Sequence, residues 1–245
     1  MKNFILLLIF ITQLLTAQIP NILISKQFEP EEVCIAINPK NTNQIIAGSN
    51  LNSAYYSSDA GLTWQRTQVN CYPYGVYGDP VVFWDTTQTA YFMNLSNPNK
   101  KILNDGSWID RIVINKSKNF GKTYDTCFAF GKNGSKVQDK HWVAVDPKTN
   151  FIHVSWTQFD KYESKLKTDS TIIRYSNSKD GGITWTEPLR ISSFAGDCLD
   201  SDSTVEGAVP CIGEKGKIYI AWAGPKGLCI TKSLDGGNTF LKKEK

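Results

Sequence analysis

The sequence predicts an all-β protein built from repeated sheets, and three observations support this fold class. An eight-residue phrase, Ser-x-Asp-x-Gly-x-Thr-aromatic, occurs four times with small changes, starting at Ser57, Ser117, Ser178 and Ser233. The starts are 60, 61 and 55 residues apart, and such a period is typical of stacked supersecondary units. Runs of β-branched and aromatic residues, separated by turn-rich segments, precede each phrase.

The phrase itself has the composition of a hairpin turn. Its third position is a short side chain that can accept hydrogen bonds from the backbone amides of the turn. The glycine two residues later can adopt a positive φ, and the final aromatic residue can pack on a sheet. The second copy has Asn119 and Tyr124 in place of Asp and Trp, which keeps both the acceptor and the ring. The pattern therefore predicts a structural role for the four acceptors, Asp59, Asn119, Asp180 and Asp235.

Each period has room for four strands. The strand just before each phrase covers residues 54–56, 111–114, 171–175 and 228–231. The strand before that covers 44–50, 89–94, 151–157 and 217–223, and the first strand covers 33–37, 81–84, 142–145 and 209–212. A fourth strand is expected after each phrase. Four antiparallel strands per repeat are the blade of a β-propeller.

The phrase resembles the Asp-box, also called the bacterial neuraminidase (BNR) repeat, of sialidase-like β-propellers. The resemblance implies one box per blade over nearly all of residues 18–245. Closed propellers of this kind have six blades, whereas this chain has boxes for four, so the resemblance implies a propeller that is incomplete at the C-terminus or closed by an unusual route. Asp-box propellers also occur in xyloglucan hydrolases, sortilin-type receptors and photosystem assembly factors, so the resemblance implies the fold and leaves the activity open.

Residues 1–17 are predicted to be a secretory signal peptide. Lys2 precedes the apolar run 4–15, and the small residue Ala17 ends the segment. The run is shorter than the roughly 20 apolar residues of a membrane span, so we expect an exported protein, secreted, extracellular or periplasmic, with no span after cleavage. The net charge of +4 is scattered along the chain, which argues against a nucleic-acid partner.

The six cysteines are compatible with disulfides in an exported protein. We expect Cys198 to pair with Cys211, because both lie in the connection between the third and fourth blades. Cys34 and Cys229 lie in expected strands, where a buried thiol is the simpler interpretation. Cys71 and Cys127 follow the first two boxes, and the sequence does not pair them.

The longest loops are expected at the end of the blades opposite the boxes, where binding sites usually lie. Acidic residues precede the first strand of every blade there: Glu31, Glu32, Asp79, Asp139 and Glu206. Because first strands start near the axis of a propeller, these carboxylates should line its mouth. They are either a glycosidase carboxylate pair or a cation site, or strand-start acids that bond loop amides. The expected ligand-binding residues are Glu31, Tyr74, Trp108, Asp139, Tyr162 and Glu206, and the catalytic candidates are Asp79, Asp139, Glu206, Tyr77 and Arg111.

Two further groups of residues are candidate sites. Asp197, Asp200 and Asp202 form either a Ca²⁺-binding loop or a solvated acidic turn, and no other cofactor is expected. His141 lies next to the mouth and is interpreted as a structural residue rather than a base or a ligand.

The sequence departs from the sialidases in its arginines. The resemblance implies a three-arginine clamp on the substrate carboxylate, with the first arginine in an Arg-Ile-Pro motif, but residues 31–33 are Glu-Glu-Val. Lysine replaces arginine poorly in such a clamp, and of the four arginines only Arg111 is expected at the open end. We therefore predict an exported propeller that binds an extracellular glycan or glycoprotein without catalysis. The alternatives are a glycoside hydrolase of exo-α-sialidase type whose remaining blades are missing, and a scaffold for protein contacts.

Overall fold

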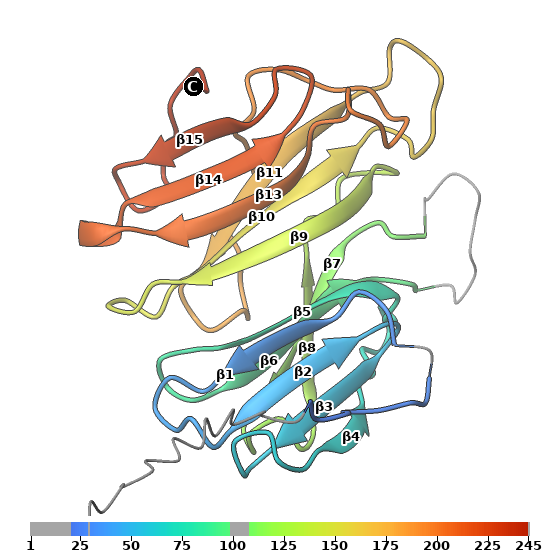
Figure 1. The fold of residues 1–245 in the computed structure, drawn as a ribbon. Coiled ribbons are helices and arrows are strands. Elements are labelled where there is room, and N and C mark those ends of the chain that lie inside the picture. Colours follow the sequence, from blue (N-terminus) through green and yellow to red (C-terminus); the bar gives the residue numbers. More distant parts are fainter. Residues whose placement is uncertain (1–20, 29, 99–107, 245) are drawn as a thin grey trace, which may run out of the picture.

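The computed structural model describes residues 21–28, 30–98 and 108–244, and the predicted signal peptide at 1–17 lies outside them. The all-β prediction is confirmed: the described chain forms four antiparallel sheets and one short 3-10 turn, Glu214–Gly216 (Figure 1). Within this part of the chain, no helix is long and apolar enough to cross a membrane.

Each sheet is a meander of consecutive strands and corresponds to one predicted blade. The first contains β1 (Cys34–Ile37), β2 (Ile45–Ser49), β3 (Ser53–Ser57) and β4 (Gln65–Gln68). The second contains β5 (Gly78–Trp84), β6 (Ala90–Leu95), β7 (Ile112–Ser117) and β8 (Thr126–Phe130). The third contains β9 (Val137–Val145), β10 (Ile152–Phe159), β11 (Thr171–Ser178) and β12 (Leu189–Arg190), and the fourth contains β13 (Glu206–Ile212), β14 (Ile218–Ala223) and β15 (Cys229–Ser233).

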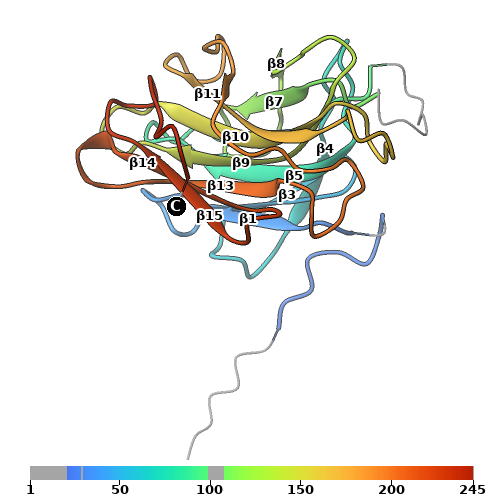
Figure 2. The same cartoon turned by 90° about the horizontal axis from the view of Figure 1, so that it is seen from above.

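The blades follow one another in chain order, and the first strands β1, β5, β9 and β13 are successive neighbours (Figures 1 and 2). Apolar clusters fill the three joints between consecutive blades. The first strands of blades two to four begin earlier than the sequence predicts, at Gly78, Val137 and Glu206. The fourth blade has three strands among the described residues. In place of the expected fourth strand there is one backbone hydrogen bond, from the Leu241 amide to the Lys232 carbonyl.

The four boxes lie between the third and fourth strand positions, as the repeat predicts. In the first box, Asp59 Oδ1 accepts hydrogen bonds from the Ser57 hydroxyl (2.7 Å) and the Thr63 amide (2.9 Å). The Thr63 and Thr239 side chains, together with their amides, lower the pKa of Asp59 and Asp235 to about 2. The acceptor side chains are thus used by their own turns.

The boxes also connect neighbouring blades, a role that the sequence did not suggest. The box aromatic contacts the blade before it: Trp185 stacks on Phe130 with ring centroids 3.8 Å apart, and Phe240 meets Tyr175 edge-on at 4.7 Å. The box glycine lies equally close, because a Cβ at Gly121 would be 2.6 Å from Ile46 of the first blade. Each of these boxes therefore closes the joint with the preceding blade.

The predicted disulfide between Cys198 and Cys211 is wrong. Cys198 is buried in an apolar cluster with Trp108 and Phe159 at the loop end. Cys211 is exposed near the far end of β13, and both thiols are free. A strand rises about 3.3 Å per residue, so the length of β13 separates the two thiols.

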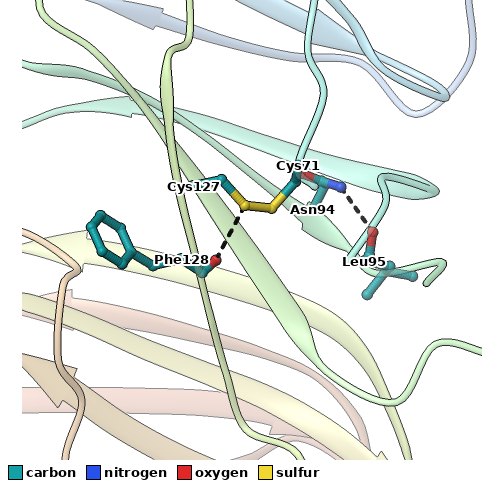
Figure 3. Close-up of a disulfide and its surroundings, with 5 residues drawn as sticks. All are labelled: Cys71, Asn94, Leu95, Cys127 and Phe128. Atoms are coloured by element: carbon teal, nitrogen blue, oxygen red, sulfur yellow. Dashed lines mark hydrogen bonds between the residues drawn. A yellow bond between two sulfur atoms is a disulfide. The ribbon is translucent and has the colours of Figure 1, made fainter. Parts of the chain in front are cut away.

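The disulfide that forms joins Cys71 to Cys127 (Figure 3). Cys71 lies in the connection after the first blade, and Cys127 lies in β8, the outer strand of the second. The bond therefore ties the connection between these blades to the outside of the second blade. Of the two thiols expected in strands, Cys229 is buried and Cys34 is half-buried.

Candidate functional site

A left-handed backbone residue recurs near the start of the first strand in all four blades. These residues lie at the end of the molecule opposite the boxes, which we call the mouth. Glu32, Asp79, Lys140 and Gly207 each have a positive φ, of 48°, 53°, 46° and 71°. They occupy equivalent positions, two residues before Cys34, Val81, Trp142 and Val209. In blades two to four the strand pairing shifts register at this point. Such bulges redirect side chains at the rims of sheets, and left-handed residues other than glycine cost about 1 to 3 kcal/mol and cluster at functional sites.

The bulge divides the predicted acids into two registers. Glu32 and Asp79 are the left-handed residues of blades one and two, whereas Asp139 and Glu206 directly precede the left-handed residues of blades three and four. Glu31 shares the register of the second pair and is exposed on the rim. The acids thus occupy equivalent positions in the four blades to within one residue, as the repeat predicts. Lys140 is the left-handed residue of the third blade and corresponds to Glu32 and Asp79.

Specific contacts hold this group together. Glu32 accepts a hydrogen bond from the Asp79 amide (3.2 Å) and another from the Asn50 side chain. The ammonium of Lys140 lies 3.6 Å from Asp79 Oδ2, and its amide donates to Asp139 Oδ1 at 2.8 Å. Asp139 is only 6% exposed. The first three blades therefore bring three carboxyls around one lysine.

The environment raises the pKa of these carboxyls. Burial and the negative charge of Asp139 raise the pKa of Asp79, and burial raises the pKa of Asp139. Burial and the charge of Asp200 raise the pKa of Glu206 to about 7. Burial alone would lower the pKa of Lys140, but the surrounding carboxylates raise it. At neutral pH the mouth therefore holds a protonated lysine beside carboxyls that retain protons more readily than usual.

Glu206 predicts a pH dependence of stability. Because its pKa rises from 4.5 to about 7 on folding, the folded state binds this proton more tightly than the unfolded state. The free energy of unfolding is then highest below the unfolded pKa and falls as the pH rises through this window. In Glu206→Gln, the free energy of unfolding should fall by about 1 to 2 kcal/mol less over this pH range than in the parent, a figure that allows for solvent screening. Urea unfolding of the parent and the variant at about pH 5 and about pH 8 measures this difference. Glu187→Gln, on the exposed surface, is the control. An equal decrease in the free energy of unfolding in all three proteins would contradict a raised pKa for Glu206.

The predicted aromatic residues have different roles. Trp108 is 7% exposed and lies in an apolar cluster with Leu95, Val137 and Phe159, where Tyr77 meets it edge-on at 3.8 Å. Tyr162 packs on this cluster and donates its hydroxyl to Asp200 at 3.1 Å. Trp108 thus belongs to the buried cluster at this end of the molecule, Tyr77 joins that cluster to the hollow that it lines, and Tyr162 fixes the acidic residue that acts on Glu206.

Arg111 lies at the open end, as predicted, because it directly precedes Ile112, which pairs with Leu95 at that end of the second blade; Arg66 is placed differently from the prediction. Arg111 forms two hydrogen bonds of 2.7 Å with Asp110, next to Lys132, and its guanidinium lies over Tyr74. It is therefore committed to a neighbouring carboxylate. Arg66, which the sequence did not place at the open end, lies there in contact with the Phe28 ring and the Ser53 hydroxyl.

Two hollows meet at Glu32 and Asp79. A cavity of about 200 Å³ is also lined by Lys140, His141 and Trp142. A wider hollow of about 730 Å³ extends over the first blade to Arg66, Tyr77 and Glu31. Burial lowers the pKa of His141 to about 4, so this imidazole is neutral. Trp142 is 42% exposed, and sequence reasoning treated it only as a strand residue.

The three aspartates in the connection between the third and fourth blades do not gather around one point. Asp197 accepts hydrogen bonds from Thr204 and Ser201 within its own loop, Asp200 accepts from Tyr162, and Asp202 is exposed. Throughout the residues that the structure describes, no group of three His, Cys, Asp or Glu side chains could hold a metal ion. The geometry favours the solvated-turn interpretation of this loop.

No protein-family model and no curated protein matches this sequence. Among solved structures, a protein of unknown function from Dyadobacter fermentans is 15% identical, with a TM-score of 0.64 over 90% of this chain and 70% of its own. An α-L-arabinofuranosidase from Fusarium graminearum is 10% identical, with a TM-score of 0.54 over 86% of this chain and 62% of its own. An ulvan lyase of a new polysaccharide lyase family is 12% identical, with a TM-score of 0.53 over 82% of this chain and 55% of its own.

These similarities concern the fold alone, because every identity is low. The chain spans 55 to 70% of the three proteins. The narrower resemblance to sialidases remains a prediction.

Proposed function

We propose that the mouth of this propeller binds an extracellular glycan without a carboxylate of its own. The observation that carries the proposal is the convergence of Glu32, Asp79 and Lys140 on a cavity next to a wide hollow. The charges of Asp139 and Glu206 act on the same lysine. Carboxylates accept hydrogen bonds from hydroxyls, and protonated carboxyls and lysine donate them. Trp142 adds an exposed indole face in the same cavity, which suits the apolar face of a sugar ring.

The charge of the site argues for a neutral ligand. Four carboxyls, those of Glu32, Asp79, Asp139 and Glu206, act on the single ammonium of Lys140. A sialic acid or a uronic acid would add another carboxylate to this group. Recognition of such a ligand calls for arginine, and Arg111 is already paired with Asp110. Arg66 lines the adjoining hollow, so it remains the one arginine through which a sialoside could be held.

Two further observations support the proposal. Two of the proteins with a similar fold are, by their names, carbohydrate-active enzymes. The disulfide between Cys71 and Cys127 fits an oxidising compartment, in agreement with the predicted signal peptide.

Glycoside hydrolysis is the second candidate. A general acid must carry a proton near neutral pH, and Glu206, with a pKa of about 7, meets this requirement beside other carboxyls. A paired carboxylate would act as the base or the nucleophile. Release of reducing sugar that Glu206→Gln abolishes would favour this candidate over binding alone.

Binding measurements with neutral oligosaccharides of arabinose, galactose and glucose, and with sialyllactose, test the proposal. We expect a neutral oligosaccharide to bind, and we expect Asp79→Asn and Trp142→Ala each to weaken it by at least about tenfold. Asp79→Asn should leave the melting temperature unchanged or raise it, because it removes a like charge from the group. The matched control is Asp235→Asn at the opposite end, since Asn119 already occupies the equivalent position in the second blade.

Three outcomes would contradict the proposal. They are no binding of any neutral glycan, preferential binding of sialyllactose, and a lower melting temperature for Asp79→Asn with unchanged binding.

A further inference from the structure

A third hollow adjoins the two hollows at the mouth. It has a volume of about 390 Å³ and is lined by Asn52, by the connection from Asn70 to Val76, and by Asn97 after β6. Asn52 also lines the wider hollow that reaches Asp79, so the two hollows are neighbours. We call the third one the outer hollow. Its sides come from the first and second blades, which lie next to each other within the described chain.

Together the three hollows form one groove across the mouth end of the first blade. The groove starts at Glu32, two residues before β1, and passes Asn52 in the turn between β2 and β3. It ends at Asn70, two residues after β4. Neighbouring strands lie about 4.8 Å apart, so a groove across four strands is about 14 Å long. A single sugar ring does not fill this length, whereas a chain of several rings does.

The lining of the outer hollow is polar and uncharged. The described residues that line it include three asparagines and no Asp, Glu, Lys or Arg. An amide side chain both donates and accepts hydrogen bonds, as a sugar hydroxyl does. Asn97 Oδ1 is buried and has no hydrogen-bond partner among the described residues, and an unpaired buried acceptor is costly. The outer hollow therefore suits the hydroxyls of a neutral ligand.

An exposed aromatic ring stands at the outer end of the groove. Tyr72 lines the outer hollow and is 94% exposed. A phenol ring with one polar end suits a sugar ring, which has an apolar face and polar edges. Trp142 supplies a surface of the same kind in the cavity at the inner end. The groove thus has an aromatic ring near each end and amides between them.

Backbone contacts and the disulfide fix the floor of the outer hollow. The amide of Gly75 donates to the Cys71 carbonyl at 2.6 Å, and the amide of Asn97 donates to the Tyr74 carbonyl at 2.8 Å. A Cβ at Gly75 would lie 2.2 Å from the Asn97 carbonyl oxygen, so this turn packs directly on the backbone after β6. Cys71 is bonded to Cys127 of β8 (Figure 3). A surface held in this way loses little conformational freedom when it binds a ligand.

We propose that this groove binds a linear chain of neutral sugar units, as in a polysaccharide, rather than one terminal sugar. The inference rests on the proposed binding of a neutral glycan at the mouth and extends that site outward. Units beside Asp79 occupy the mouth, and the next units lie over Asn52 and reach Tyr72. Because Tyr72 is exposed, the chain can continue beyond it into solvent. The disulfide then supports binding as well as stability, since it holds the outer part of the site in place.

Calorimetric titration with linear oligosaccharides of arabinose, galactose and glucose, from the disaccharide to the hexasaccharide, tests the proposal. For the sugar that the mouth binds, the hexasaccharide should bind at least about tenfold more tightly than the disaccharide. Tyr72→Ala and Asn70→Ala should each remove most of this gain and leave the affinity for the disaccharide unchanged, because both side chains line the outer hollow and not the wider one. Both residues are exposed, so both variants should melt like the parent.

The matched control is Asn43→Ala. Asn43 is an exposed asparagine in the turn between β1 and β2, at the opposite end of the molecule. Its substitution should change neither affinity. Equal affinities of the parent for the disaccharide and the hexasaccharide would overturn the groove, and so would a gain that survives Tyr72→Ala and Asn70→Ala together.

The disulfide provides a second test. Cys71→Ser with Cys127→Ser, under conditions where this variant is folded, should keep the affinity for the disaccharide and lose most of the gain for the hexasaccharide. A full gain in this variant would overturn the role of the disulfide in the groove.

Asp79→Asn separates failure of the groove from failure of the proposed function. If chain length brings no gain but Asp79→Asn still weakens binding of the disaccharide, the groove is wrong and the mouth remains the binding site. If none of these sugars binds the parent, the proposed function is contradicted and the groove with it.

Discussion

Replacing Cys71 and Cys127 together by serine is expected to lower the free energy of unfolding by about 4 kcal/mol. The bond closes a loop with a sequence separation of 56 residues, and a cross-link of this length removes much of the entropy of the unfolded chain. It also ties the connection after the first blade to β8 of the second. Both the length of the loop and the position of the bond across a joint make this the largest single effect that we expect.

Urea unfolding of the oxidised parent and the double variant measures this loss. Cys211→Ser is the matched control, because this thiol is free and exposed, and it should leave the unfolding midpoint unchanged. The parent in a reducing buffer should resemble the double variant. A midpoint that is the same with and without the disulfide would show that the two blades are held together without it.

Gly121→Ala is expected to destabilise the protein by about 3 kcal/mol or more. Gly121 has a φ of +84°, and an added Cβ would lie 2.6 Å from Ile46 Cγ2 in the first blade. The left-handed conformation costs a residue with a Cβ about 1 to 2 kcal/mol, and overpacking of a buried joint costs about 1 to 3 kcal/mol more. Ile46 is fully buried and belongs to the cluster of that joint, so it has little room to move.

Gly61→Ala is the matched control for this prediction. Gly61 has nearly the same conformation, with a φ of +87°, but its nearest neighbour would be 3.5 Å away. We expect only the conformational part of the loss, about 1 to 2 kcal/mol. The difference between the two variants, measured by urea unfolding, isolates the contact between blades. Equal losses would show that the box acts within its own blade alone.

The fold class and the box turns were predictable because their interactions are local. The hydrogen bonds of a box join residues that are at most four positions apart, such as Ser57 with Gly61 and Asp59 with Thr63. The repeat then supplied the number of strands in the first three blades and the position of the boxes between third and fourth strands. The same count of residues along the repeat placed Asp79, Asp139 and Glu206 at one end of the molecule.

The composition of the mouth was only partly predictable. The repeat identifies equivalent positions, so Lys140 was within reach of sequence reasoning once Glu32 and Asp79 had been aligned with it. The left-handed backbone at these positions has no signature in the side chains, except at Gly207. The place of Arg66 depends on the direction of a long side chain that reaches Ser53 on the next strand, and a strand position alone does not give this direction.

What the sequence by itself determined is the design of one blade, because every interaction that defines a blade lies within a single period of the repeat. What only the tertiary structure decided is how the blades meet. The pairing of Cys71 with Cys127, the fit of Gly121 on Ile46 and the shared environment of Asp79 and Asp139 each join different blades. Such contacts depend on which faces are adjacent and how far apart they lie, and the spacing of residues along the chain carries neither quantity.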